Sequence, residues 1–427
     1  MKLPNAFVEN IANLFRDKAE LDAFLASLRD ERHYGLRANT LKADIDDFLK
    51  IFNRADALEP IPWCEEGFYY NAQKEAAMGK NPLYNAGLYY IQEPSAMSAV
   101  SLLNVEPGDK VLDLCASPGG KSTQIAAKLQ GRGLLVSNDA NFSRMPQLLK
   151  NVEMAGIKNI ILLCEMADRL ATKFEGFFDK ILIDAPCSGE GMFRKDPTAI
   201  TAWDEKKPAR LAVIQKDILK HTATMLAPNG VMVYSTCTFN TTENEDVIED
   251  FLANHKDFQL VASKRIFPHR DRGEGHFVAS LRRVGDDAKK ATSLSKVASF
   301  KNIFFNEFCD KYALNLPEGQ IFQHKDKLFL APEIYPNLDG LRTVRVGLFL
   351  GTLKKQRFEP SYALALSLKK GDFSQVIDLD PNDPKVAKFL KGETFEVDAA
   401  DGYNLFCVAG YSIGFAKVLR GRVKGHI

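Results

Sequence analysis

Short apolar stretches alternate with helix-like patterns through the middle of the chain. Runs rich in β-branched residues and leucine predict strands at 110–114, 133–138, 159–163, 178–184 and 230–235. Between them, apolar residues recur at helical spacing over 122–129, 144–155 and 208–226. Another helix is expected at 242–254, where Thr242 and Glu245 have the spacing of a capping box. Strand–helix alternation of this kind predicts a doubly wound parallel sheet, whose ligands bind outside the carboxyl ends of the strands.

The two ends of the chain have different patterns. Helical spacing at 9–15, 19–28 and 45–52, with a strand-like segment at 35–42, predicts a mixed α/β unit. A polar stretch at 282–296 is expected to be a linker, and shorter strands are predicted beyond it at 344–350, 395–397, 403–408 and 413–418. We therefore expect an N-terminal extension over 1–103, the sheet domain over 104–284, a small connecting domain over 297–343 and a β-rich domain over 344–427.

Composition excludes several classes of protein. The 427 residues are 45% hydrophobic and 26% charged, as in ordinary globular domains. The net charge of +1 speaks against a uniformly basic nucleic-acid binder, although a total says nothing about how charge is distributed. No apolar run approaches the roughly 18 residues of a membrane span, and the first residues lack the apolar core of a signal peptide. A cytoplasmic protein is expected.

The cysteines narrow the chemistry further. There are seven, an odd number, widely spaced and without a Cys-x-x-Cys pair, so neither a disulfide framework nor a zinc site is expected, and no metal is predicted. Cys187 and Cys237 directly follow the fourth and fifth predicted strands, whose ends face the ligand crevice. The others are interpreted as apolar filler: Cys64, Cys115, Cys164, Cys309 and Cys407.

The first predicted strand runs into a glycine-containing turn, Leu114-Cys115-Ala116-Ser117-Pro118-Gly119-Gly120-Lys121-Ser122. Such a turn lets backbone N–H groups approach an anionic group at a helix N-terminus. A phosphate-binding P-loop is excluded because Cys115 stands where its first glycine is required, and the dinucleotide fingerprint Gly-x-Gly-x-x-Gly is absent. The remaining class is a nucleoside with a small zwitterionic tail, such as S-adenosylmethionine.

Carboxylates follow the next two strands. Asp139 lies about 20 residues beyond the turn, where a carboxylate accepts hydrogen bonds from ribose hydroxyls. After the third strand, Asp168 is a candidate acceptor for an adenine amino group, with Glu165 as the alternative. Both positions favour a nucleoside ligand.

The fourth and fifth strands end in the densest groups of reactive side chains, Asp184 to Lys195 and Tyr234 to Thr238. A thiolate beside a methyl donor has a specific use, because carbon 5 of a pyrimidine takes a methyl group only after a nucleophile has added to carbon 6. Asp184 is expected to stabilise that addition at ring nitrogen 3 or at the exocyclic amine. The residues alone do not decide whether Cys187 or Cys237 attacks.

Three of these segments, 113–121, 184–191 and 235–238, resemble in order the signature motifs of the NOL1/NOP2/Sun family of S-adenosylmethionine-dependent RNA cytosine-5 methyltransferases. The resemblance extends to 37–42, 90–97, 267–269 and 273–277. The segments 347–352 and 357–361 resemble the RsmF-type branch, which modifies 16S ribosomal RNA and carries a C-terminal PUA-like RNA-binding domain. The resemblance implies a Rossmann-like methyltransferase sheet with an N-terminal α/β extension and a β-rich PUA-like end.

The resemblance also implies roles for individual residues. Cys237 is the expected nucleophile, and Cys187 the thiol that assists product release, the reverse of DNA cytosine-5 methyltransferases. Asp184 is expected between the sulfonium and the target base, Asp139 and Arg144 at the ribose, and Asp168 at the adenine. Residues of the glycine turn are expected around the cofactor's methionine end: Cys115, Ala116, Pro118, Gly119, Gly120 and Lys121.

RNA contacts are predicted from charge. The target cytosine must be unpaired or flipped out of its stack to be reached. From residue 342 to 427 there are 14 Lys and Arg against 9 Asp and Glu, a local charge of +5, which suits an RNA-docking module. Phe193 is as consistent with core packing as with base stacking. The candidate contacts are Arg194, Lys195, His269, Arg270, Arg272, Lys417, Arg420, Arg422 and Lys424.

Function and partners follow as expectations. The leading hypothesis is methylation of 16S ribosomal RNA, free or within the 30S subunit, by a monomer that binds S-adenosyl-L-methionine and neither DNA nor membrane. One alternative is a non-catalytic RNA-binding or ribosome-assembly factor on the same scaffold, and another is a methyltransferase acting on tRNA. The presence of both thiols, Asp184 and the cofactor turn speaks against the non-catalytic alternative.

Overall fold

The fold is seen in a computed structural model that describes residues 3–52, 57–73, 78–285, 293–295, 300–317 and 319–426. The linker predicted at 282–296 lies largely outside the described residues. No helix in the described ranges is long and apolar enough to cross a membrane.

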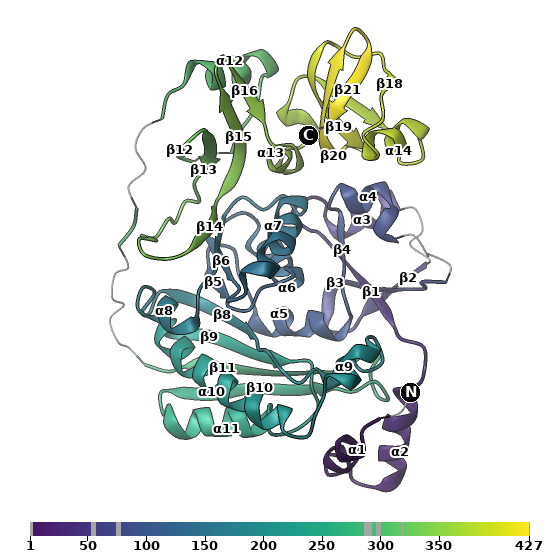
Figure 1. The fold of residues 1–427 in the computed structure, drawn as a ribbon, viewed down its shortest axis with the longest axis vertical. Coiled ribbons are helices and arrows are strands. Elements are labelled where there is room, and N and C mark those ends of the chain that lie inside the picture. The colour runs from purple at the N-terminus through teal and green to yellow at the C-terminus, as the bar shows by residue number, and fades with distance from the viewer. Residues whose placement is uncertain are drawn as a thin grey trace.

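A sheet of eight strands forms the centre of the molecule (Figure 1), in the order β10-β11-β9-β8-β5-β6-β7-β14. Five neighbouring strands run parallel, as the sequence predicts: β5 (Lys110–Asp113), β6 (Leu134–Asn138), β7 (Ile160–Leu163), β8 (Phe178–Asp184) and β9 (Leu226–Thr236). The antiparallel strands β11 (His276–Arg283) and β10 (Phe258–Ile266) continue the sheet beyond β9. The strand order reverses between β5 and β8, which marks the expected ligand crevice.

Helices cover both faces of this sheet. Alternate residues of the strands enter two different cores, so that Leu112 and Ile181 pack on one face while Val111 and Leu182 pack on the other. One face carries α8 (Ala167–Ala171), α10 (Lys207–Met225) and α11 (Glu245–Asn254). The other carries α5 (Ser98–Leu103), α6 (Gly120–Leu129) and α7 (Met145–Met154).

The predicted start of the helix at 242–254 is wrong. α11 begins at Glu245, with Asn244 at the cap position and no capping side chain. The Glu245 carboxylate does not reach back to the helix start, because it receives hydrogen bonds from the guanidinium of Arg265 on β10. Residues 237–244 therefore precede the helix and form a polar loop, which is part of the site described below.

The N-terminal segment folds onto a second sheet with the order β2-β3-β1-β4. Its strands are β1 (Tyr34–Ala38), β2 (Leu58–Ile61), β3 (Cys64–Tyr70) and β4 (Tyr89–Ile91). Its helices are α1 (Asn5–Ala12), α2 (Lys18–Ser27), α3 (Ile45–Phe52) and α4 (Pro82–Asn85). Phe24 of α2 packs against Phe239 and Phe267 of the central domain, beside the loop that follows β9, and Phe7 of α1 packs against Phe193 and Trp203.

Two further sheets form the C-terminal part. The first has the order β12-β13-β15-β16, with β12 (Ile321–His324), β13 (Lys327–Leu330), β15 (Leu348–Lys354), β16 (Arg357–Pro360), α12 (Ile303–Tyr312) and α13 (Tyr362–Ser367). The second has the order β17-β19-β20-β21-β18, with β17 (Val376–Leu379), β18 (Phe395–Glu396), β19 (Gly402–Val408), β20 (Tyr411–Leu419), β21 (Arg422–His426) and α14 (Pro384–Leu390).

The single strand predicted at 344–350 is two strands, which is a second correction. The chain breaks at Gly347, where φ is 60° and a Cβ would lie 1.9 Å from the Leu330 carbonyl oxygen. Before the break, β14 (Thr343–Val346) pairs antiparallel with β7 at the edge of the central sheet. After it, β15 pairs with β13, so strands on both sides of the expected domain limit at 343/344 share one sheet.

Candidate active site

The glycine turn lies at the carboxyl end of β5, where the strand order reverses. Gly119 has a φ of 112°, a left-handed conformation that favours glycine, and α6 begins at the next residue. No side chain caps α6, which leaves the N–H groups of its first turn for a ligand. The sequence prediction of an anion-accepting turn at this position agrees with this geometry.

Arg37 fixes the start of α6 from the N-terminal sheet, a role the sequence analysis missed. Its buried guanidinium donates hydrogen bonds to the Gly120 carbonyl oxygen at 2.9 Å and to Thr123 Oγ1 at 2.7 Å. Its Nε donates to Gln92 Oε1 at 3.1 Å. A buried charge is held only where it is hydrogen-bonded, so this arginine ties three segments together beside the turn. In the sequence, the only indication of this role was that Arg37 belongs to the segment 37–42, which resembles a family motif.

Asp184 ends β8 and faces a lysine from the turn. Lys121 Nζ donates to Asp184 Oδ2 at 2.7 Å, and Ser235 Oγ on β9 donates to Asp184 Oδ1 at 3.0 Å. Burial alone would raise the pKa of Asp184, but the nearby charge of Lys121 and these hydrogen bonds outweigh it and hold the pKa below its usual value. The group is therefore a carboxylate, an acceptor of hydrogen bonds at neutral pH.

A histidine lies beside this pair. His276, the first residue of β11, is 3% exposed, and its Nε2 is 3.9 Å from Asp184 Oδ1. Burial and the charge of Lys121 lower the pKa of His276 to about 4, so the ring is neutral at physiological pH. Because it carries no charge, the histidine leaves Lys121 as the cation that pairs with Asp184.

The two predicted thiols lie side by side. Cys187 follows β8 and Cys237 follows β9, and their Sγ atoms are 3.4 Å apart. Both side chains are half-buried. The hydrogen bond with Cys237, together with burial, raises the pKa of the Cys187 thiol well above its usual value. Cys187 is therefore held as a protonated thiol next to the sulfur of Cys237.

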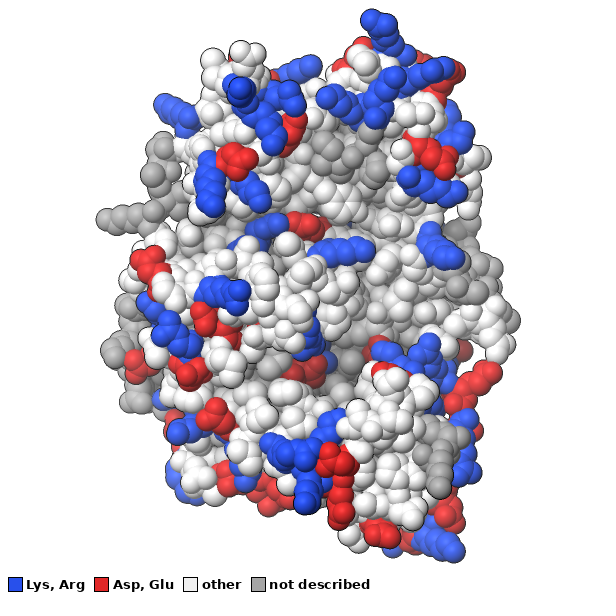
Figure 2. Space-filling model, viewed as in Figure 1, with Lys and Arg blue, Asp and Glu red and all other residues white. Residues whose placement is uncertain are grey.

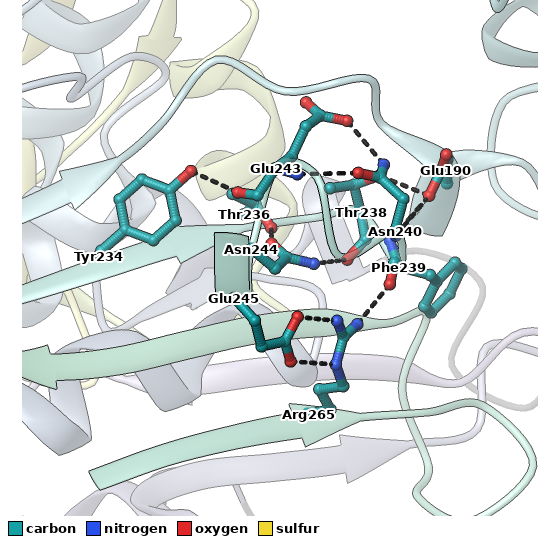
Figure 3. A network of polar contacts seen from close by, with 10 residues as sticks. All are labelled: Glu190, Tyr234, Thr236, Thr238, Phe239, Asn240, Glu243, Asn244, Glu245 and Arg265. Carbon is teal, nitrogen blue, oxygen red and sulfur yellow. Dashed lines mark hydrogen bonds and ion pairs between the residues drawn. The ribbon is translucent and has the colours of Figure 1, made fainter. Parts of the chain in front are cut away.

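Two buried glutamates brace the loops that carry these thiols (Figure 3), and the sequence analysis did not single them out. Glu190 Oε2 accepts hydrogen bonds from Thr238 Oγ1 at 2.7 Å and from the backbone N–H groups of Phe239 and Asn240 at 2.9 and 3.0 Å. Glu243 Oε1 accepts from the Ser188 backbone at 2.8 Å. Each glutamate links the loop after β8 to the loop after β9, so the two thiols are held by one network.

Residues predicted for the rest of the cofactor lie along the same edge. Asp139 is buried after β6, accepts a hydrogen bond from the Ser117 backbone at 3.1 Å and pairs with Arg144 at 3.2 Å. Asp168 is exposed, and the alternative, Glu165, already accepts a hydrogen bond from the Arg342 backbone at 2.6 Å. Asp168 Oδ1 also accepts a hydrogen bond, from the Arg169 backbone at 2.8 Å, so both carboxylates stay candidates for the adenine amine.

Asn138 joins the strand ends beneath these residues. Its side chain donates to the carbonyl oxygens of Leu114 and Glu165 at 3.0 and 2.9 Å and accepts from the Glu165 backbone at 2.9 Å. The turn residues Cys115 and Ala116 lie directly beyond it, and the Ala116 N–H donates to the Asn138 carbonyl oxygen at 2.8 Å. The predicted cofactor residues at the ends of β5, β6 and β7 are therefore joined along one edge of the sheet.

Family models match nearly the whole chain. They are described as 16S rRNA methyltransferase RsmB/F over residues 100–282, the N-terminal domain of 16S rRNA methyltransferase RsmF over 3–94, the RsmF rRNA methyltransferase first C-terminal domain over 307–368 and the methyltransferase RsmF PUA domain over 376–427. The chain is also 32% identical over 457 aligned residues to ribosomal RNA small subunit methyltransferase F of Vibrio vulnificus, covering 99% of this chain and 96% of that protein. The chain belongs to the RsmF family.

Other relatives agree with this assignment. The ribosomal RNA small subunit methyltransferase F of Erwinia tasmaniensis is 31% identical over 99% of this chain and 95% of its own length. A solved methyltransferase homologue from Pyrococcus horikoshii is 26% identical, with a TM-score of 0.55 over 66% of this chain and all of its own. NSun6 from the same organism, solved with SFG, has a TM-score of 0.59 over 66% of this chain and 99% of its own at 22% identity, and shows a shared fold.

Two of the RNA contacts predicted from charge, Arg194 and His269, make contacts within the protein instead, which corrects that part of the prediction. Phe193 is fully buried. Arg194 pairs with Glu274 at 2.8 Å and donates to the carbonyl oxygens of Ser27 and Gly273. The His269 side chain is 7% exposed and packs against the rings of Phe15 and Phe24. These side chains fix the loop after β8 against the N-terminal helices instead of facing solvent.

The remaining candidates are accessible. Lys195 is exposed, while Arg270 and Arg272 are about half exposed and pair with Glu20 and Glu59. In the segment matched by the PUA model, four exposed cations follow the β20–β21 hairpin: Lys417, Arg420, Arg422 and Lys424. Figure 2 shows Lys and Arg spread over the upper part of the visible face, where the C-terminal sheets lie.

The five cysteines interpreted as filler are all at least partly buried. Cys64, Cys164 and Cys407 are buried, and Cys115 and Cys309 are half-buried. Burial raises the pKa of Cys64 and of Cys407 to about 12, and that of Cys309 to about 11. A thiol in an apolar environment is unreactive because its thiolate is disfavoured.

Proposed function

We propose that this RsmF-family protein transfers a methyl group from S-adenosylmethionine to carbon 5 of a cytosine in 16S ribosomal RNA. The observation that carries the proposal is the pair of sulfur atoms 3.4 Å apart, at the ends of adjacent parallel strands and beside Asp184. Four family models and relatives of at least 95% coverage support the ribosomal substrate.

The crevice fits the proposed methyl donor. The uncapped start of α6 suits the donor's carboxylate, and Cys115, Ala116, Pro118, Gly119 and Gly120 form the turn that would hold its methionine end. Asp139 and Arg144 would bind the ribose side, and the exposed Asp168 would accept from the adenine amine. When bound, S-adenosylmethionine supplies an electrophilic methyl group. A related fold was solved with SFG, an analogue of this donor.

Cys237 acts first in the proposed mechanism. Its thiolate adds to carbon 6 of the cytosine, forming an S–C6 bond and giving carbon 5 the electron density to attack the methyl group. The carbon-5 proton then passes to water, the electron pair of the C5–H bond forms the C5–C6 double bond, and the S–C6 bond breaks to return the Cys237 thiolate and release 5-methylcytosine. Cys187 assists the release step from 3.4 Å away.

Asp184 orients the base. Because Lys121 and Ser235 hold it as a carboxylate, it accepts a hydrogen bond from the exocyclic amine of cytosine and does not donate one to ring nitrogen 3. A carboxylate favours cytosine over uracil at this position, since uracil carries a carbonyl where cytosine carries the amine. Thus Asp184 contributes to the selection and the orientation of the base.

The test is methyl transfer from tritiated S-adenosylmethionine by the purified full-length protein. Separate reactions contain a 16S rRNA transcript, isolated 30S subunits and a tRNA pool, and bisulfite sequencing locates the product. We expect 5-methylcytosine in 16S rRNA alone. Modification of tRNA instead would overturn the substrate, and a titration that detects no S-adenosylmethionine binding would favour the assembly-factor alternative. Sedimentation of the same preparation tests the proposed monomer.

A further inference from the structure

A groove of about 290 Å³ lies at the end of the N-terminal sheet, outside the crevice described above. It is lined by four aromatic side chains and two cations: His33, Tyr34, Tyr69, Tyr70, Arg32 and Arg272. The first five come from β1, β3 and the residue pair before β1, and Arg272 comes from the loop between β10 and β11. Aromatic rings interleaved with arginines are typical of surfaces that bind unpaired nucleobases.

Strand alternation explains why so many rings gather here. Tyr34 and Tyr70 are directly opposite in the antiparallel register of β1 and β3, with ring centroids 5.8 Å apart. Their neighbours His33 and Tyr69 point to the other face of the sheet. Since the groove lies where the strands end, side chains of both faces reach it, and Tyr34, Tyr70 and His33 keep part of their surface exposed.

Both arginines are stacked on tyrosine rings, and acidic residues lie close to them. Arg32 lies over the ring of Tyr34 at 4.5 Å, and Arg272 lies over the ring of Tyr69 at 4.1 Å. Arg272 pairs with Glu59, and Glu31 also lines the groove. The positive charge is therefore balanced locally, so the groove suits the flat face and polar edge of a base better than a phosphate.

The groove is close to the reaction. Arg272 is four residues before His276, and a segment of that length spans at most about 14 Å when extended. His276 lies 3.9 Å from Asp184. Between them, Gly275 approaches Gly191 so closely that a Cβ on Gly191 would lie 2.9 Å from the Gly275 carbonyl oxygen. One short segment thus connects the groove to the base-binding carboxylate and to the loop after β8.

We propose that this groove binds an unpaired base of the RNA substrate, adjacent in the RNA to the cytosine that is methylated. The inference rests on the proposed function, since it assumes an RNA substrate in the crevice. Stacking in the groove holds the flanking nucleotide out of the RNA helix and so keeps the target base accessible. Affinity contributed in this way comes from aromatic surface and not from phosphate neutralisation.

The experiment measures RNA binding and turnover for Tyr34→Ala and Tyr70→Ala in the full-length protein. We expect either substitution to raise KM for the 16S rRNA transcript roughly tenfold. We expect kcat and KM for S-adenosylmethionine to be unchanged. Fluorescence anisotropy over a salt series should show weaker binding with the same dependence of log K on log salt, because the variants still neutralise every phosphate that the wild type does.

Two variants serve as controls. Tyr34→Phe keeps the ring and should bind as the wild type does. Tyr84→Ala removes a half-buried tyrosine of the same domain that does not line the groove, and should leave RNA affinity unchanged. Unchanged affinity in both groove variants, or a loss of affinity that disappears at high salt, would overturn the proposal.

A second measurement avoids variants that fail to fold. Wild-type protein is irradiated with 16S rRNA transcript containing 5-bromouridine, and crosslinked peptides are sequenced by mass spectrometry. Crosslinks at 31–34 or 69–73 support the groove, and crosslinks confined to other segments overturn it. If the wild type transfers no methyl group to any RNA, the proposed function fails, whereas normal transfer without these crosslinks or affinity losses rejects the groove alone.

Discussion

At the scale of single residues, the paired thiols make the sharpest prediction. Cys237→Ala removes the nucleophile and should abolish methyl transfer and adduct formation. Cys187→Ala should allow addition but slow release, so a covalent protein–RNA adduct accumulates and survives a denaturing gel. The assignment of the two roles rests on the family resemblance, and the sulfur separation of 3.4 Å lets both thiols reach the same base.

The control for this pair is Cys309→Ala. Cys309 is equally half-buried but belongs to α12, far along the chain from the crevice, and its substitution should leave turnover and adduct level unchanged. An active Cys187→Ala enzyme combined with an adduct in Cys237→Ala would show that the two roles are reversed.

A buried acid under the glycine turn gives a prediction about pH. Burial raises the pKa of Asp113 to about 7, and Ser122 Oγ donates to it at 2.6 Å. The folded state therefore binds a proton that the unfolded chain has released, so this group destabilises the fold progressively as pH rises from about 4 to 7. Asp113→Asn removes the ionisable group, and with it the free-energy cost of burying its charge. Relative to wild type, its Tm should rise by at least about 2 °C across that range.

The measurement is thermal unfolding of both proteins at pH 5, 6, 7 and 8. The difference in Tm should grow up to about pH 7 and then level off, because the folded acid begins to ionise there and the cost is then constant. A difference that is constant over all four pH values would mean that Asp113 is ionised throughout.

Some residues could be predicted from sequence and others could not. Lys121 and Asp184 follow predicted strands, so the sheet topology alone brings them together, as it does Cys187 and Cys237. The role of Arg194 could not be foreseen, since its partner Glu274 lies 80 positions later in the chain. A basic residue next to a catalytic motif indicates RNA equally well until its counter-ion is known.

At the scale of elements, the loops after β8 and β9 act as one unit because Glu190 holds them together. Glu190 is buried and accepts four hydrogen bonds, including one from Trp203 Nε1 at 3.2 Å. Glu190→Gln places an amide N–H₂ against donors, leaving at least one buried group unsatisfied at a cost of about 1–3 kcal/mol. We expect a lower Tm and at least a tenfold lower kcat, because the Cys237 loop is no longer fixed.

The matched control is Glu205→Gln, the same substitution at an exposed position nearby. It should change neither Tm nor kcat. If Glu190→Gln lowered Tm but kept normal kcat at a temperature where it is folded, the network would stabilise the fold without positioning the thiol.

The element boundaries show where sequence patterns lose information. The parallel strands could be predicted because short apolar runs that alternate with helical segments are typical of the buried strands of a parallel sheet. The start of α11 was not, because Thr242 and Glu245 fit a capping box while Glu245 instead binds Arg265 on a neighbouring strand. The break at Gly347 depends on the Leu330 carbonyl, which no local pattern reveals.

At the scale of the whole molecule, the C-terminal part is joined to the catalytic sheet. β14 extends the sheet at β7, the Gly347 N–H donates to the Ile160 carbonyl oxygen at 2.7 Å, and Arg345 pairs with Glu153 at 2.6 Å with both side chains mostly buried. Thr343 pairs with Leu163, and a strand pairing over so long a separation in the chain is invisible to sequence periodicity. This pairing makes residues 343–346 of the C-terminal part an edge strand of the catalytic sheet.

The last prediction concerns the basic hairpin of β20 and β21. Replacing Lys417, Arg420, Arg422 and Lys424 by Gln removes four exposed cations and should weaken binding to any RNA, whatever its sequence. The slope of log K against log salt should fall by roughly 0.7 for each single-strand phosphate that the hairpin no longer neutralises. With transcript in excess, kcat should be unchanged, because no residue of the crevice is altered.

A charge-matched control separates specific contacts from total charge. Replacing Lys207, Arg210, Lys216 and Lys220 of α10 by Gln removes the same four charges from the helix that covers the opposite part of the molecule. If the hairpin contacts RNA, only its variant lowers the salt slope. An equal decrease of the salt slope in both variants would mean that RNA binding depends on the protein's net charge, which is +1 in the wild type, and not on the positions of the cations.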